Sequence, residues 1–169
     1  VELLVNGKSY GIKKNDKTNP KMRNQIRWEN VVYQDGNCEA IARTNGKVVA
    51  RHKIVTVGKA VALKAVADNS DWKADGMDLQ HIRIIAVDSK GRRVPNAVAE
   101  VKVNVVGDAQ LVAMSNGNIN SDELNVTDHQ SLFNGSCLAI LRSGVASSPV
   151  IVNISAPCLK AAKLKLATK

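Results

Sequence analysis

The chain has 169 residues, a formal net charge of +9 and an aromatic content of only 3%. This length exceeds that of one small domain and suits two, and the apolar fraction of 44% is enough for packed cores and argues against disorder. Proteins that hold single-stranded nucleic acid stack bases on aromatic side chains, and sugar-binding modules commonly stack sugar rings on them, so the composition disfavours both classes. The aromatic residues are Trp28, Trp72, Tyr10, Tyr33 and Phe133.

The first third of the chain has the pattern of short strands joined by tight turns. Asn-Gly and Asp-Gly dipeptides, which tolerate the positive φ of a two-residue hairpin turn, separate runs of apolar and β-branched residues. The turns are Asn6-Gly7, Asp35-Gly36 and Asn45-Gly46, and the predicted strands are Val1–Val5, Ser9–Ile12, Ile26–Tyr33, Cys38–Thr44 and Lys47–Thr56. The pattern predicts an antiparallel meander of about five strands.

A basic segment, Lys13–Arg23, lies between the second and third of these strands. Such a segment can bind nucleic acid or another anionic surface, or it can be a loop whose lysines are only solvated. No recognition helix and no interleaved aromatic residue accompanies it, so we interpret it as a solvated loop. We expect neither nucleic acid nor a membrane as a partner.

The predicted domain boundary lies at Val57–Ala60 and divides the chain into residues 1–57 and 58–169. The sequence begins inside a predicted strand, with no Met and no signal-like stretch, so we expect the first domain to be incomplete at its N-terminus. A lost strand would leave its neighbour with an unpaired edge. We therefore expect self-association through Val1–Ile12, which a strictly monomeric mass in solution would contradict.

The second domain continues with strict alternation of apolar and polar side chains, which is typical of half-buried strands. The predicted strands include Val61–Ala67, Leu79–Asp88, Val101–Val105, Val150–Ile154 and Lys163–Leu166. No window carries an amphipathic helical stripe. Short strands at regular spacing with turn residues between them predict an all-β sandwich or barrel.

One segment of the second domain has the alternation of a calcium loop. Asn116, Asn118, Asn120 and Asp122 carry side-chain oxygens at every second position, and calcium prefers hard oxygen ligands. Three of the four are neutral amides, so the charge is low for such a site. We favour a turn-rich loop, with calcium as the alternative, and predict no other metal and no cofactor.

No other group of residues has the pattern of a catalytic site. Asp128, His129 and Ser131 could form a hydrolytic trio, but no nucleophile elbow accompanies them, and we interpret them as part of a polar loop. His52 and His81 lie on predicted strands beside polar neighbours and are expected to be surface or satisfied histidines. We predict no catalytic residue in the chain.

The three cysteines are Cys38, Cys137 and Cys158, with no Cys-x-x-Cys pair and no histidine at metal-ligand spacing. We expect them to pack as small hydrophobic residues, with a bridge between Cys137 and Cys158 as the alternative. The tryptophans are expected to pack as well, Trp28 in a core and Trp72 in a buried contact.

Several of these motifs resemble the C-terminal region of glycoside hydrolase family 2, the β-galactosidase-like enzymes. The run VELLVNGKSYG at residues 1–11 is similar to a signature of that region, and residues 26–36, 39–50 and 56–58 follow in the family's order. The run KADGMDL at residues 73–79, with DSKG, VPNA, NGN and FNG further on, is similar to the immunoglobulin-like domain that comes next in these enzymes. Cys158 departs from the family, which has glycine before Leu159, a residue that suggests positive φ there.

The resemblance implies two consecutive immunoglobulin-like β-sandwich domains with a structural, non-catalytic role. In the family the two catalytic glutamates lie in a separate barrel domain upstream, and we find no acid/base pair among the glutamates here, which are Glu2, Glu29, Glu39, Glu100 and Glu123. It also implies a bacterial enzyme that is secreted, periplasmic or at the cell surface, with its own upstream domains as partners and weak contact to carbohydrate. A carbohydrate-binding or adhesin-type module is the alternative.

Overall fold

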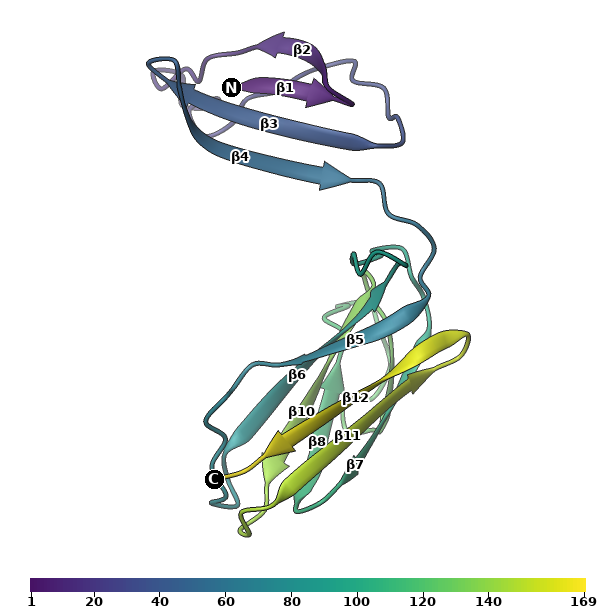
Figure 1. The fold of residues 1–169 in the computed structure, drawn as a ribbon. Coiled ribbons are helices and arrows are strands. Elements are labelled where there is room, and N and C mark those ends of the chain that lie inside the picture. Colours follow the sequence, from purple (N-terminus) through teal and green to yellow (C-terminus); the bar gives the residue numbers. More distant parts are fainter. The chain divides into compact units, whose positions relative to one another are not determined.

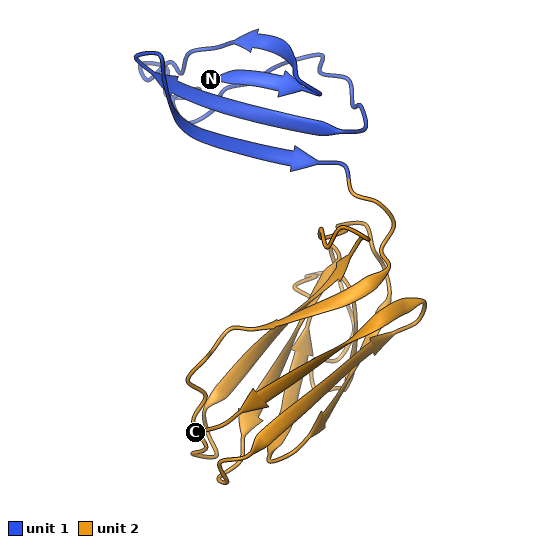
Figure 2. Cartoon of the chain, in the orientation of Figure 1, with its two compact units in different colours: residues 1–56 blue, residues 57–169 orange.

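The computed structural model describes all 169 residues and contains twelve strands and no helix, which confirms the predicted all-β fold. No helix long and apolar enough to cross a membrane is therefore present. The chain divides into two compact units, residues 1–56 and residues 57–169, which we call unit 1 and unit 2 (Figure 2). The predicted boundary between residues 57 and 58 lies one residue from this division.

Unit 1 is a four-stranded antiparallel sheet in the order β2-β1-β3-β4 (Figure 1). Its strands are β1 (Glu2–Val5), β2 (Lys8–Ile12), β3 (Asn37–Thr44) and β4 (Lys47–Val55). Both predicted Asn-Gly hairpins form, because Asn6, Gly7, Asn45 and Gly46 all adopt positive φ, between 48° and 81°.

The predicted strand at Ile26–Tyr33 is wrong, because residues 13–36 contain no strand. Asn30 adopts a left-handed φ of 61° in the middle of this range, which interrupts an extended run. The indole Nε1 of Trp28 donates to the carbonyl of Gly11 at 3.3 Å, so this residue is held against β2 by its side chain and not by a strand ladder.

Only the second half of the segment Val1–Ile12, which forms β2, lies at an unpaired edge of the sheet. β1 is internal to the sheet, paired with β2 on one side and β3 on the other, while β2 lies at one edge and β4 at the other. Self-association through this segment stays a prediction, and β2 is the strand that is free to make it.

Unit 1 buries little apolar surface. Val5 and Ile41 are its only fully buried apolar residues, whereas all nine residues of β4 are exposed, including Ile54 at 60%. The sheet therefore has no extensive core on either face.

Unit 2 is a β-sandwich whose eight strands run in the order β8-β10-β6-β5-β12-β11-β7-β9 (Figure 1). The eight strands form two layers, which meet where β12 pairs with β5 in the one parallel pairing, Lys160 opposite Ala62. The first layer consists of β8, β10, β6 and β5, and the second consists of the other four strands. The strands are β5 (Ala62–Ala67), β6 (Leu79–Val87), β7 (Glu100–Val106), β8 (Ala109–Ser115), β9 (His129–Ser131), β10 (Ser136–Ser143), β11 (Pro149–Ala156) and β12 (Leu159–Ala167).

The core of unit 2 lies between these layers and follows the predicted alternation. Ile82, Ile84 and Ala86 of β6 are completely buried, while Arg83 between them is exposed. The same pattern places Val101 and Val103 of β7 and Val150, Val152 and Ile154 of β11 inside. Trp72 is 1% exposed and its Nε1 donates to the carbonyl of Asp78 at 3.0 Å, which confirms the buried contact predicted for it.

Candidate functional site

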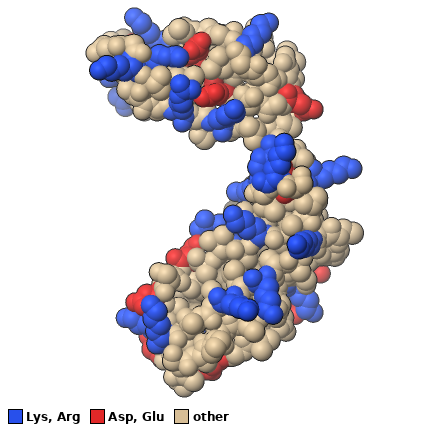
Figure 3. All heavy atoms as spheres, in the orientation of Figure 1, with Lys and Arg blue, Asp and Glu red and all other residues tan.

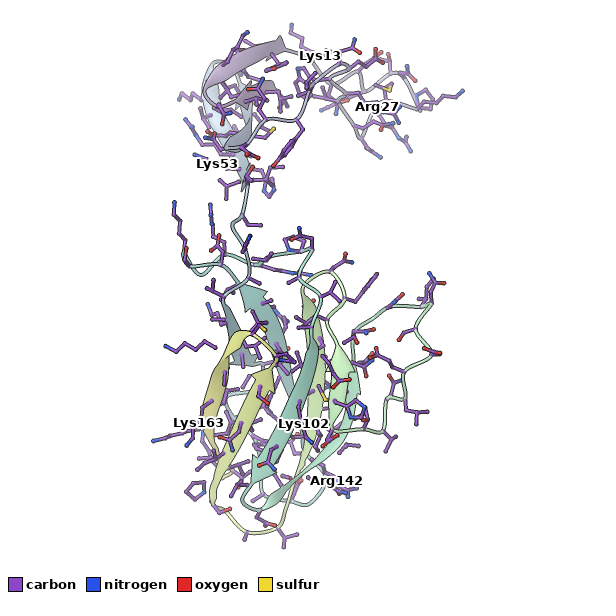
Figure 4. All side chains as sticks on the ribbon, turned by 90° about the vertical axis from the view of Figure 1, so that its right-hand side faces the viewer. Lys13, Arg27, Lys53, Lys102, Arg142 and Lys163 are labelled. Atoms are coloured by element: carbon purple, nitrogen blue, oxygen red, sulfur yellow. The ribbon has the colours of Figure 1, made fainter.

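The candidate binding surface of unit 1 is the basic loop, residues 13–27, which leaves the sheet after β2. The two ends of the loop are tied together, because the Lys13 Nζ donates to the carbonyl of Arg27 at 2.7 Å and the Asn15 Nδ2 donates to the carbonyl of Arg23 at 2.6 Å. Lys13 also exchanges two backbone bonds with Val1 at the start of the chain. Figure 4 shows Lys13 and Arg27 where the loop joins the sheet.

The interior of the basic loop is a series of turns closed by short polar side chains. The Asp16 carboxylate accepts hydrogen bonds from the Thr18 backbone N–H at 3.0 Å and from its hydroxyl at 2.6 Å. The hydrogen bond from the Thr18 hydroxyl lowers the pKa of Asp16, so this carboxylate stays ionised and engaged within the loop. The carbonyl of Asn19 accepts two further backbone bonds, from Met22 and Arg23.

The basic loop carries six cations and one acid, and none of the cations forms an ion pair. The cations are Lys13, Lys14, Lys17, Lys21, Arg23 and Arg27. Elsewhere in unit 1 the arginines do pair, Arg43 with Glu2 at 2.8 Å and Arg51 with Glu39 at 3.1 Å. The loop surrounds a shallow hollow of about 170 Å³ whose lining includes three of these cations, Lys13, Lys14 and Arg27, and the acid Asp16. This arrangement can attract and hold an anion.

Trp28, at the end of the basic loop, is half-buried and not part of a core. Its indole faces Lys13, whose Nζ lies 6.0 Å from the ring centroid, a distance at the outer limit of a cation–π contact. The prediction of a core position is therefore wrong, because unit 1 has no core large enough to enclose an indole.

The calcium candidates of unit 2 lie in the loop between β8 and β9. The Asn116 Oδ1 accepts the backbone N–H of Asn118 at 2.9 Å, and the Asn118 Oδ1 accepts that of Asn120 at 3.1 Å, so two of the four proposed ligand oxygens close local turns. Asp122 is exposed, and no group of three or more His, Cys, Asp or Glu side chains is close enough to hold a metal ion. A calcium site here stays a prediction, which calorimetric titration with Ca²⁺ would test.

Glu123 organises the same loop, and sequence reasoning missed it. Its carboxylate accepts four hydrogen bonds, from Asn116 Nδ2 at 3.1 Å, Ser121 Oγ at 3.1 Å, Gln130 Nε2 at 2.8 Å and the Ser131 backbone N–H at 2.9 Å. Hydrogen bonding by the Ser131 side chain above all, and then by the Ser131 backbone, Ser121 and Gln130, lowers the pKa of Glu123. The only sequence signal is a lone glutamate within a run of Asn and Ser, which does not reveal partners seven or eight residues away.

Asp128, His129 and Ser131 do not form a hydrolytic trio of hydrogen bonds. The His129 Nδ1 lies 2.9 Å from Asp128 and 3.0 Å from the Thr127 hydroxyl, and the bond to Asp128 raises the pKa of His129. Ser131 bonds instead to Glu123 through its backbone. The histidine and its aspartate are both exposed. The prediction of a polar loop is wrong for His129 and Ser131, because these residues lie on β9, which pairs with β7.

The carboxylates of the chain are stabilised in their charged form wherever their pKa is shifted. Asp88 accepts bonds from the Arg92 guanidinium and from the backbone of Gly58, Lys90 and Arg92, and the Arg92 contact above all lowers its pKa. The other lowered pKa values belong to Glu2, Asp16, Asp75, Glu123 and Asp128. A general acid needs the opposite shift, so none of these groups is prepared to protonate a leaving group.

The three cysteines are free. Cys137 is buried between the layers, and burial raises the pKa of its thiol to about 12. Cys158 is exposed at the turn between β11 and β12 with a φ of 59°, the positive value expected from glycine in the resembled family.

Two family models match the chain. Glycoside hydrolase family 2 C-terminal domain 5 matches residues 63–165, and a domain of unknown function, DUF4982, matches residues 1–50.

Three relatives span the two units. The β-galactosidase BoGH2A of Bacteroides ovatus is 32% identical over the whole chain, and a putative β-glucuronidase of Formosa agariphila is 31% identical over 85% of it. A crystal structure of a glycosyl hydrolase family 2 member from Bacteroides cellulosilyticus superposes with a TM-score of 0.93 over 99% of the chain at 32% identity. The chain spans only 19%, 14% and 21% of these proteins, respectively.

Proposed function

We propose that this chain, which belongs to the C-terminal domains of glycoside hydrolase family 2, is a non-catalytic region of a longer enzyme that hydrolyses β-glycosidic bonds in a separate barrel domain. The observation that carries the proposal is how much of its relatives the chain covers. The relatives align with the whole chain, but the chain accounts for only about a fifth of their length. The remaining parts of such an enzyme would be its partners.

The chemistry of the carboxylates supports a non-catalytic role. A retaining glycosidase needs one carboxyl group with a raised pKa and a second carboxylate about 5–5.5 Å away in a sugar pocket. Here Glu2 and Glu39 are engaged by arginines, and four donors surround Glu123. Glu29 and Glu100 are exposed.

The surface offers little to a neutral sugar, which disfavours the alternative of a dedicated carbohydrate-binding module. Trp72 is buried and Trp28 is half-buried. Tyr33 is 75% exposed, but its hydroxyl is held by Asp35 at 2.8 Å and Thr56 at 3.2 Å. A platform of several aromatic rings is absent.

The names of the relatives divide between a neutral sugar, galactose, and an acidic one, glucuronic acid. We propose that the substrate of the longer enzyme is a β-linked glycan of one of these two kinds. We also propose export to the periplasm, cell surface or medium, which fractionation of the source cells with an antibody against this chain would test.

The role of the chain is tested by deleting it from the longer enzyme. A structural role predicts that the truncated enzyme retains its kcat on a chromogenic β-galactoside or β-glucuronide and loses thermal stability. A truncated enzyme that stays folded by circular dichroism but loses kcat by orders of magnitude, with KM unchanged, would contradict the proposal, because the chain would then supply a catalytic group.

A further inference from the structure

We propose that the basic loop, residues 13–27, is a binding site for an acidic glycan, a carbohydrate that carries carboxylate or sulfate groups. The inference rests on the proposed function in one respect, which is that the ligand is a carbohydrate. The structure indicates that the ligand is negatively charged and that it binds at the basic loop.

The first support is unbalanced charge. Six cations in fifteen residues face one acid, Asp16, whose carboxylate is occupied by Thr18. The ion pairs of unit 1 involve Arg43 and Arg51, and both lie on the sheet, outside the loop. The positive charge of the loop is therefore not balanced by ion pairs within unit 1. On the face of unit 1 that Figure 3 shows, Asp and Glu side chains lie among the Lys and Arg side chains.

The second support is that hydrogen bonds close the loop despite this repulsion. Side chains cross-link its two arms at Lys13–Arg27 and Asn15–Arg23, and the Gln25 Nε2 donates to the carbonyl of Lys21 at 2.7 Å. A loop needed only for solubility requires no such cross-links. A cationic surface whose backbone is held by such bonds loses less conformational entropy when an anion binds, so its affinity is higher than that of an unconstrained lysine-rich segment.

The third support is the lining of the hollow within the loop. Lys14 and Arg27 supply positive charge, next to the one carboxylate of the lining, that of Asp16. The Gln25 amide is engaged by Lys21 and Arg27, but the Asn19 Nδ2 makes no hydrogen bond in the loop and can donate to a sugar hydroxyl. Met22 and Ile26 form an apolar part of the same lining. Anionic groups, hydroxyls and apolar ring faces are the three surfaces that an acidic sugar presents.

A nucleic acid fits this surface less well. No exposed aromatic ring lies within the loop to stack a base, since the indole of Trp28 is half-buried. The loop contains neither a helix nor a two-stranded ribbon that could enter a major groove. The observations therefore favour an acidic glycan, and duplex DNA becomes an arm of the test.

The test measures binding of the 169-residue chain to polyglucuronate by calorimetry or affinity electrophoresis, with a neutral β-galactan and a short DNA duplex as comparison probes. The loop variant is Lys14→Gln/Lys17→Gln/Lys21→Gln, three exposed lysines whose side chains make no hydrogen bond in the loop. The matched control is Lys160→Gln/Lys163→Gln/Lys165→Gln on β12 of unit 2, which removes the same charge from exposed positions (Figure 4). Unchanged circular dichroism and tryptophan fluorescence establish that the variants are folded.

We expect polyglucuronate to bind, the affinity to fall with rising salt, and the loop variant to bind about tenfold more weakly while the control variant binds as well as the unmodified chain. The neutral galactan should not bind. Equal weakening by the two variants would overturn the site, because it would reveal only general attraction to a basic protein. Equal or tighter binding of DNA, or of the neutral galactan, would overturn the assignment to acidic glycans.

Failure of this inference is distinguishable from failure of the proposed function. If the longer enzyme hydrolyses a glycoside while the chain ignores polyglucuronate, the inference is wrong and the proposed function stands. If the longer enzyme hydrolyses no glycoside, but polyglucuronate binding is weakened in the loop variant and unchanged in the control variant, the site stands and the proposed function is wrong.

Discussion

Unit 1 and unit 2 are made of the same kind of strand and the same kind of turn, but they differ in what covers the strands. Fifteen buried residues from both layers form the core of unit 2, whereas unit 1 has a single sheet that fully buries only Val5 and Ile41. Turn chemistry is thus enough to define strands locally, and stability depends on a second layer. Each fully buried Val, Leu or Ile contributes about 1.5–3 kcal/mol, so most of the folding free energy belongs to unit 2.

The chain provides a separate reporter for each unit, because Trp28 lies in unit 1 and Trp72 in unit 2. Replacing one tryptophan with phenylalanine leaves the fluorescence of the other as a signal for its own unit. We expect Trp28 to report unfolding at a lower urea concentration than Trp72. Coincident transitions would contradict the difference between the units.

The largest effect should come from matched isoleucines in the two units. Ile84 is completely buried in unit 2, and Ile84→Ala should lower the free energy of unfolding of unit 2 by about 2–5 kcal/mol, since it removes apolar contacts and leaves a cavity. Ile54 on β4 is 60% exposed, and Ile54→Ala should change the stability of unit 1 by less than about 0.5 kcal/mol. Urea titrations followed at each tryptophan measure both, and similar losses at the two sites would refute the comparison.

A second pair compares crowded glycines. A Cβ at Gly135, which has a φ of 69°, would collide with the backbone carbonyl of Val94, which cannot move away. We expect Gly135→Ala to cost unit 2 about 3 kcal/mol. Gly36 in unit 1 has a φ of 129°, which strains any residue with a Cβ, and that Cβ would also meet the side chain of Asn6. Asn6 can rotate but would lose its bonds to Asp35 and Asn37, so Gly36→Ala should cost about 2–3 kcal/mol.

The same urea titrations measure this pair, with Gly91→Ala as the control. Gly91 has a φ of 73° and open space around its Cβ position, so only the backbone preference is lost, about 1 kcal/mol. A loss at Gly135 no larger than that at Gly91 would show that the contact with Val94 is unimportant.

Acid should weaken unit 2 through Asp88 and Glu123. Both have a pKa below the ordinary values of 3.8 and 4.5, so their contribution to stability is complete above those values and is lost as the pH falls through the lower pKa of the folded state. The urea midpoint at Trp72 should therefore decline below about pH 4.5. Glu123→Gln should lower this midpoint at neutral pH and reduce its dependence on acid; a variant with the full acid dependence would exclude Glu123 as a contributor.

The smallest effect should be a gain. Cys158 adopts a left-handed φ of 59°, which costs a residue with a Cβ about 1 kcal/mol relative to glycine. Cys158→Gly should raise the free energy of unfolding of unit 2 by about 0.5–1 kcal/mol. Cys158→Ala serves as the control and should bring no gain, since alanine has the same backbone preference.

Sequence reasoning predicted the strands that an Asn-Gly turn joins and those in which buried and exposed residues alternate. The Asn6-Gly7 and Asn45-Gly46 hairpins and the alternation in β6, β7 and β11 are local patterns, and the structure contains all of them. The Ile26–Tyr33 strand failed because its apolar residues have no neighbouring strand to pair with and Asn30 is left-handed.

The contacts that organise the loops were not predictable from local pattern. Glu123 is joined to Gln130 and Ser131 across a turn, and Lys13 is joined to Arg27 across the basic loop. Such pairs depend on how the chain returns on itself, which strand periodicity does not encode. The positive φ at residue 158 was predicted through resemblance to a family that has glycine there.

The most direct test of the central claim, that this chain supplies no catalytic group, is the turnover of chromogenic β-galactoside and β-glucuronide by the purified 169-residue chain beside the longer enzyme. The account predicts turnover by the longer enzyme and none above the uncatalysed rate by the chain. Hydrolysis by the chain alone, retained through purification to homogeneity, would contradict it.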